Sequence, residues 1–177
     1  MILGYPVLDL HSSNSHLDIG IQPGADPAAV QFDQKHPKMP LDKMFIMDEN
    51  EGRYFIDFEA SMNAYIFDGE YTPEEEDFYS LQNQVTASTA PAFIWHNGDD
   101  GLIYPTNSLL FANALQRNGV PYELHIFNGG GHGVSLADHL TANDINQYCL
   151  HSSVWMDQSI KWINERSKFK ENILSSL

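Results

Sequence analysis

The chain has 177 residues, of which 42% are hydrophobic and 12% aromatic, a size and composition typical of one globular domain. Nine Lys and Arg stand against 24 Asp and Glu, for a formal net charge of −15, so the electrostatic field of the chain repels phosphate backbones and argues against nucleic acid as a partner. No apolar run approaches the roughly 18 residues that a membrane-spanning helix needs, and we expect no membrane association.

Cys149 is the single cysteine, which excludes an intrachain disulfide and is typical of a reducing compartment. The first eight residues carry no basic residue and no small-residue cleavage motif, a pattern that argues against a secretory signal. We therefore expect a cytoplasmic protein. No strand-to-helix turn precedes Cys149, so we interpret its thiol as structural rather than as a nucleophile.

The chain opens on an apolar run at residues 2–8 that ends in a polar loop, as a buried parallel strand does. A domain that opens inside its sheet suggests that another segment normally precedes it. Residues 12–80 follow with irregular spacing and several turn dipeptides, yet carry too many large apolar residues for a disordered linker. We interpret residues 12–80 as a cap or lid-like insertion over a site. A plain connecting crossover with its own small core is the alternative.

Strands and helices alternate in the remainder of the chain. A capping threonine, a proline and three acids start a predicted helix over residues 72–81. Strands predicted over residues 91–96 and 122–127 flank a helix over residues 106–118, which a glycine ends. Residues 154–166 have the apolar period of a final helix. This alternation predicts an α/β fold with a parallel sheet and right-handed crossovers.

Two of the predicted strands run into loops that carry a titratable side chain. Asp100 follows the strand at residues 91–96, and His132 lies among glycines after the strand at residues 122–127. The carboxyl ends of parallel strands meet at one edge of a sheet, so these side chains can meet in space. Asp100 would then hold the imidazole tautomer, and His132 would take and return the proton of a serine hydroxyl.

Other acids and histidines compete for these roles. Asp99 is the alternative acid, but neighbouring residues at a strand end point in opposite directions, so we expect only one of the two aspartates to face His132. We interpret His96 as a buried structural imidazole and His125 as a hydrogen-bonded or surface-facing one. No histidine pair has the spacing of a zinc site, and we expect neither a metal nor another cofactor.

The chain contains no G-x-S-x-G nucleophile elbow. A dense set of motifs nevertheless lies within residues 78–136. It comprises Ser80, Gln84, Val85, Thr86, Pro91, Trp95, His96, Asp99, Asp100, Pro105, Asn107, Ser108, Leu109, Leu110, Gly119, Val120, Pro121 and residues 123–127 and 131–133, with residues 2–7 near the start of the chain.

These motifs resemble the carboxyl-terminal part of bacterial α/β-hydrolase esterases, of the lipase-type group that includes acetylesterases and xylan-esterase-like enzymes. The resemblance implies that residues 1–177 form a single, partial α/β-hydrolase domain that supplies the sixth, seventh and eighth strands of the family's sheet. It also implies that Asp100 is the catalytic acid and His132 the catalytic base. The family's oxyanion loop and nucleophile elbow are expected upstream of this segment.

The resemblance implies a carboxylic ester hydrolase of serine-hydrolase mechanism, in which this chain carries the acid and the base but not the nucleophile. Its substrate would be a small ester with a short acyl or acetyl group, or an acetylated sugar. The alternative is a non-catalytic binding or assembly module on a hydrolase scaffold, and a peptidase or thioesterase would keep the same fold. An exposed apolar sheet edge further predicts self-association, or pairing with an amino-terminal half.

Overall fold

The structure is a computed structural model. It describes residues 1–10, 16–21, 45–48, 53–57, 66–67, 71–142, 145 and 148–174, and of residues 16–21, 45–48, 53–57 and 168–174 it describes the backbone only. Within these residues, no helix combines the length and the hydropathy that crossing a bilayer requires.

A parallel sheet of three strands forms the centre of the fold. Its strands are β1 (Ile2–Gly4), β5 (Ala92–Asn97) and β6 (Tyr122–Phe127), in the order β1-β5-β6. β5 pairs with both neighbours in parallel, which confirms the parallel sheet predicted from the alternation of strands and helices. β5 is buried along its whole length, as expected for a central strand covered on both faces.

The first strand is shorter than predicted. Residues 2–8 were expected to form it, but pairing ends at Gly4. Tyr5 has a φ of 37°, although its N–H still donates to the carbonyl of Trp95 at 2.8 Å. Pro6 follows and has no N–H with which to continue the ladder. The left-handed conformation of Tyr5 and the proline after it therefore turn the chain away from the sheet after the three residues of β1.

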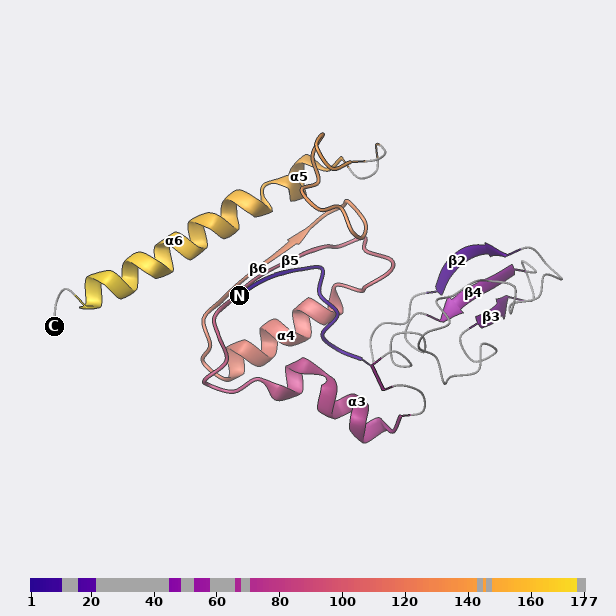
Figure 1. Ribbon diagram of the computed structural model, residues 1–177, viewed down its shortest axis with the longest axis horizontal. Helices are drawn as coiled ribbons and strands as arrows, with labels where there is room; N and C mark the ends of the chain where they lie inside the picture. Colours follow the sequence, from indigo (N-terminus) through magenta and orange to yellow (C-terminus); the bar gives the residue numbers. More distant parts are fainter. Residues whose placement is uncertain are drawn as a thin grey trace.

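Helices flank the sheet on both sides (Figure 1). They are α3 (Pro73–Tyr79), the 3₁₀ helix η2 (Leu81–Gln84), α4 (Thr106–Arg117), α5 (Leu150–Ser153) and α6 (Trp155–Leu174). Thr72 and Glu75 form a reciprocal capping box at the start of α3, which confirms the predicted helix start. α6 extends eight residues beyond the predicted end at residue 166 because no Gly or Pro interrupts the sequence up to Leu174.

The core has one hydrophobic layer on each face of the sheet, because successive side chains of β5 point in opposite directions. Ala92 and Ile94 pack with Phe111 and Leu115 of α4. Phe93 and Trp95 pack on the other face in a cluster that includes Trp162 of α6. Figure 1 shows α4 and α6 on these opposite sides of the sheet. Burying each of the larger aliphatic and phenyl side chains in these layers stabilises the fold by about 1.5–3 kcal/mol.

A second, antiparallel sheet lies within residues 12–80. Its strands are β2 (His16–Ile21), β3 (Phe45–Asp48) and β4 (Arg53–Asp57), with β4 in the middle. In Figure 1 this small sheet lies apart from the main sheet, beyond α3. The described part of residues 12–80 thus has strands of its own.

Candidate active site

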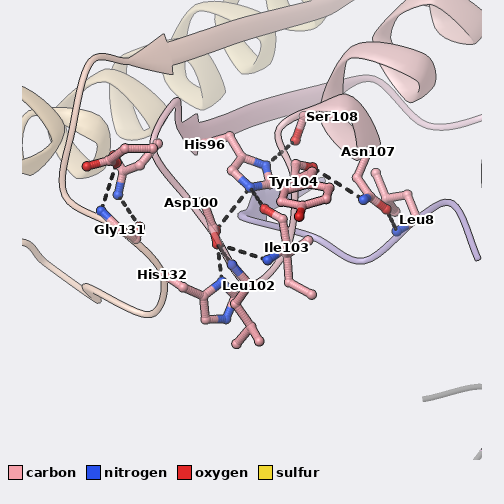
Figure 2. A network of polar contacts seen from close by, with 12 residues as sticks. Leu8, His96, Asp100, Leu102, Ile103, Tyr104, Asn107, Ser108, Gly131 and His132 are labelled. Carbon is pink, nitrogen blue, oxygen red and sulfur yellow. Dashed lines mark hydrogen bonds and ion pairs between the residues drawn. The ribbon is translucent and has the colours of Figure 1, made fainter. Parts of the chain in front are cut away.

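Asp100 lies in the turn that follows β5, and its carboxylate accepts hydrogen bonds at both oxygens (Figure 2). One oxygen, Oδ1, accepts the backbone N–H groups of Leu102 at 3.0 Å and Ile103 at 2.9 Å. The other, Oδ2, lies 2.8 Å from Nδ1 of His132. The residue is only 2% exposed. The backbone bonds hold the carboxylate plane in place, so that Oδ2 faces the imidazole.

His132 lies in the loop after β6, and its orientation follows from its contact with Asp100. A carboxylate oxygen only accepts hydrogen bonds, so Nδ1 carries the proton and donates it to Oδ2. In the neutral ring, Nε2 is then left with a lone pair, and the side chain is 29% exposed. This is the tautomer in which a histidine can act as a general base toward a group outside the core.

Glycines and side-chain hydrogen bonds shape the loop that carries His132. Gly131 has a φ of 65°, and a Cβ on Gly130 would lie 2.8 Å from Nδ2 of Asn97, so both positions favour glycine. The amide of Asn97 donates to the carbonyl of Gly131 at 2.8 Å. The Asp99 carboxylate accepts the N–H groups of Gly131 at 2.9 Å and Gly130 at 3.3 Å. The two adjacent aspartates thus serve different partners: Asp100 contacts the imidazole, and Asp99 contacts the backbone of its loop.

The other residues weighed from the sequence have structural contacts. His96 is fully buried, as expected. His125 lies 2.7 Å from Oε1 of Glu123 and is 26% exposed. The thiol of Cys149 donates to the carbonyl of Gly129 at 3.0 Å. This contact agrees with the interpretation of Cys149 as a structural thiol.

Two neighbours of the Asp100–His132 pair escaped the sequence reasoning. Nε2 of His96 lies 3.1 Å from Oδ2 of Asp100. The available signal was a histidine at a strand end four residues before the aspartate. The ring of Tyr5 lies edge-on to the ring of His132, with centroids 5.0 Å apart. No sequence pattern pointed to Tyr5, because its position depends on its left-handed backbone.

The surroundings of Asp100 stabilise its charged form. Burial alone would raise the pKa of the carboxyl, but hydrogen bonds from His132, His96 and the N–H of Ile103, with the charge of His132, lower the pKa well below its usual range. Asp100 is therefore ionised at neutral pH and can stabilise a positive charge on His132. Among the described residues, no group of three His, Cys, Asp or Glu side chains could hold a metal ion.

The loops after two adjacent parallel strands thus bring together an aspartate and a histidine at the carboxyl edge of the sheet. This arrangement, with helices on both faces, defines a partial α/β-hydrolase fold. Residues 52–165, more than half of the chain, match the prolyl oligopeptidase family. The chain belongs to that family.

Solved structures share this fold. An acetyl ester-xyloside bifunctional hydrolase from Caldicellulosiruptor lactoaceticus superposes on 94% of the chain with a TM-score of 0.59 and 26% identity. A carboxylesterase from Lactobacillus plantarum covers 94% with a TM-score of 0.58 and 23% identity, which supports the fold alone. A sugar hydrolase from Lactococcus lactis covers 56% with a TM-score of 0.53 and 34% identity.

A curated relative, endo-1,4-beta-xylanase B from Butyrivibrio fibrisolvens, is 40% identical to this chain over 67 residues, or 38% of the chain. Those residues make up 11% of the relative. The superposed regions make up 42%, 44% and 40% of the three solved structures. The chain therefore spans less than half the length of each of these four proteins.

Proposed function

We propose that this chain is part of a carboxylic ester hydrolase and that Asp100 and His132 are its catalytic acid and base. The observation that carries the proposal is the 2.8 Å hydrogen bond between Oδ2 of the buried Asp100 and Nδ1 of His132, which leaves Nε2 available for a reacting group. The nucleophile would be a serine from a segment outside these 177 residues, since the sequence contains no nucleophile elbow.

The two side chains would act in sequence. Nε2 of His132 would take the proton of the serine hydroxyl as its oxygen attacks the ester carbonyl, and would return that proton to the leaving alcohol. A water molecule would then be deprotonated in the same way to release the acid. Asp100 stabilises the imidazolium that forms in each half-reaction, because its carboxylate stays ionised.

We further propose that the substrates are small esters with an acetyl or other short acyl group, among them acetylated sugars. The name of the acetyl ester-xyloside hydrolase supports sugar esters as a substrate class, and the name of the xylanase relative supports a carbohydrate substrate. The negative charge of the chain suits a neutral substrate better than a phosphorylated one.

Reading the gene upstream of Met1 and expressing any in-frame extension tests the proposal. We expect the extension to contain a G-x-S-x-G segment and the extended protein to hydrolyse p-nitrophenyl acetate, whereas the 177-residue chain stays near background. His132→Ala should reduce kcat by about 10³-fold or more, and His125→Ala, which removes an imidazole outside the site, should leave kcat unchanged. Hydrolysis by the extended protein that survives His132→Ala would contradict the proposal. A gene without such a segment would favour the non-catalytic module.

We also propose that the sheet edge at β1 pairs with another segment or with a second copy of the chain. Within the described sheet, β1 pairs on one side only, with β5. A largely apolar hollow of about 220 Å³ lies beside it, lined by Met1, Leu3, Leu8, Leu81, Gln84, Val85, Thr89 and Phe111. An open edge next to apolar surface favours association. Sedimentation velocity should show dimers or larger species, and a monomer at high concentration would contradict pairing between copies of the chain.

For residues 12–80 we propose the role of a cap on the site of the extended enzyme. Their own small sheet, separate from the main one, supports this assignment. Replacing residues 16–57 by a short Gly/Ser linker in the extended protein should change the ratio of kcat/KM between p-nitrophenyl acetate and p-nitrophenyl butyrate. An unchanged ratio would show that the insertion does not contact the acyl group.

A further inference from the structure

One oxygen of Asp100 has two imidazole neighbours. Oδ2 lies 2.8 Å from Nδ1 of His132 and 3.1 Å from Nε2 of His96 (Figure 2). The other oxygen, Oδ1, accepts the N–H groups of Leu102 and Ile103. The carboxylate thus accepts four hydrogen bonds, about the number of lone-pair positions that it has. The proposed mechanism uses only the bond from His132.

The neighbours of His96 fix its tautomer. Nε2 lies 2.8 Å from the carbonyl oxygen of Ile103 and 3.1 Å from the carboxylate of Asp100. Both of these oxygens only accept hydrogen bonds, so Nε2 carries a proton and shares it between them. In the neutral ring, Nδ1 then accepts a hydrogen bond from the hydroxyl of Ser108, which lies 2.8 Å away. Ser108 is in the first turn of α4. His96 and Ser108 are both fully buried, so water does not compete for these bonds.

We propose that His96 is a positioning residue that acts on His132 through Asp100. Its Nε2–H occupies the same carboxylate oxygen that accepts the Nδ1–H of His132, and it thereby sets how strongly His132 binds a proton. This inference rests on the proposed roles of Asp100 and His132. Ser108 belongs to the same chain of contacts, because its hydroxyl holds the ring of His96 in the orientation that directs Nε2 toward Asp100.

The contacts of Asp100 determine whether the loss of His96 raises or lowers the proton affinity of His132. The two backbone N–H groups on Oδ1 keep the carboxylate in place when His96 is removed. The two imidazoles draw on the electron density of one oxygen, so losing the His96 donor leaves more negative charge for His132. The protonated ring of His132 is then stabilised relative to the neutral ring. Hydrogen bonds that are linked in this way change one another's strength by about 10–30%. Without the His96 donor, the proton affinity of His132 should therefore rise about two- to threefold, which is ~0.3–0.5 pH units in its half-titration point.

The other titratable groups near His132 make different contacts. The carboxylate of Asp99, from the loop after β5, accepts two backbone N–H groups of the loop that carries His132. Tyr5, after β1, faces the imidazole with its ring. Among the described residues, Asp100 is the carboxylate that hydrogen-bonds to the imidazole of His132, and His96 reaches His132 through it.

Nuclear magnetic resonance of the 177-residue chain, with ¹⁵N-labelled histidine, tests the proposal without any need for ester hydrolysis. Long-range ¹H–¹⁵N correlations report the tautomer of each ring, and a pH series gives the half-titration point of His132. In the wild-type chain we expect a proton on Nε2 of His96 and on Nδ1 of neutral His132.

Two substitutions separate the donor from the ring that carries it. In His96→Asn the shorter amide cannot reach the position of Nε2, so His132 should titrate ~0.3–0.5 pH units higher. In His96→Gln the amide nitrogen can take the place of Nε2 and should restore the wild-type midpoint. His125→Gln is the matched control, since His125 lies on the adjacent strand and pairs with Glu123 rather than Asp100.

The proposal is overturned by an unchanged or lower midpoint in His96→Asn, or by the same shift in His96→Gln. It is also overturned by a wild-type chain in which neutral His96 carries its proton on Nδ1, and this result needs no variant to fold. Failure of the proposed esterase function would appear separately, as an extended protein that hydrolyses no ester while the histidine spectra keep the expected pattern.

Discussion

The hydrogen bonds around Asp100 predict that replacing this side chain by its neutral amide costs much of the stability of the domain. The change from carboxylate to amide, Asp100→Asn, keeps the shape of the side chain. It replaces one accepting oxygen by a donating NH₂ group. If the remaining oxygen faces the N–H groups of Leu102 and Ile103, the NH₂ group faces the donors of His96 and His132. In the reverse orientation it faces the two backbone donors.

Either orientation sets the NH₂ group against donors. In the first, neutral His132 can move its proton to Nε2 and accept from the NH₂ group, but the Nε2–H of His96 still faces it; in the second, both backbone hydrogen bonds are lost. A hydrogen bond to a charged group contributes about 1.5–3 kcal/mol net. His132 can turn toward solvent because it is 29% exposed, but His96 and the backbone donors of the loop have no such freedom. We therefore expect Asp100→Asn to lower the free energy of unfolding by about 3–5 kcal/mol at pH 7. The total free energy of unfolding of a globular domain is about 5–15 kcal/mol.

The difference between wild type and Asp100→Asn should depend on pH. The pKa of Asp100 is lowered in the folded state, because the hydrogen bonds from His132 and His96 outweigh the effect of burial. Its contribution to stability is then fully present above the unfolded value near 4 and is lost as the pH falls below it toward the folded value. The amide variant lacks this contribution at every pH. The stability difference between the two proteins should therefore begin to shrink as the pH falls below about 4 and should continue to shrink with further acidification.

Urea unfolding followed by circular dichroism, at several pH values, measures this difference. Asp99→Asn is the matched control, because it makes the same change of charge one residue away. Asp99 is exposed and accepts only two backbone N–H groups, so its loss should cost about 1 kcal/mol or less. A cost below about 1 kcal/mol for Asp100→Asn, or a cost that stays constant down to pH 3, would refute the reasoning.

Three further changes probe the fold around the site by thermal unfolding. In Gly4→Ala the new Cβ would lie 2.7 Å from Nε1 of the buried Trp95, so we expect a loss of about 1–3 kcal/mol, and a wild-type Tm would contradict this close approach. Leu115→Ala, at a fully buried position, should cost about 2–5 kcal/mol, whereas Leu109→Ala, at a side chain that is 50% exposed, should cost far less. Thr72→Ala removes the capping box of α3 and should cost about 1 kcal/mol, so an unchanged free energy of unfolding would show that α3 does not depend on this cap.

The features that the sequence predicted are those that depend on local pattern. The apolar run at residues 91–96 and its polar ending gave β5 and the position of Asp100 on the loop. The glycines around His132 indicated a loop free to place an imidazole, and the structure brings that imidazole to Asp100. These predictions needed only the rule that parallel strands end at one edge of the sheet.

The features that the sequence missed depend on contacts between distant residues. His96 was recognised as buried, but its bond to Asp100 required knowing how the turn after β5 folds back along the strand. Tyr5 lies beside His132 only because its backbone is left-handed, a conformation that non-glycine residues seldom adopt. The early end of β1 has the same cause. A hydrophobic pattern specifies which residues are buried, but it does not specify such local backbone conformations.

The alternation of side chains along β5 connects the fold to the chemistry of the site. His96 lies on the face that carries Ala92 and Ile94, where α4 supplies Ser108. Asn97 lies on the opposite face, where it holds the carbonyl of Gly131 in the loop that carries His132. A shift of one residue in the pairing of β5 would exchange the two side chains between these faces. The imidazole would lose the hydroxyl of Ser108, and the loop would lose the amide of Asn97. The register that buries Ile94 against α4 is therefore the same register that places a donor beside Asp100.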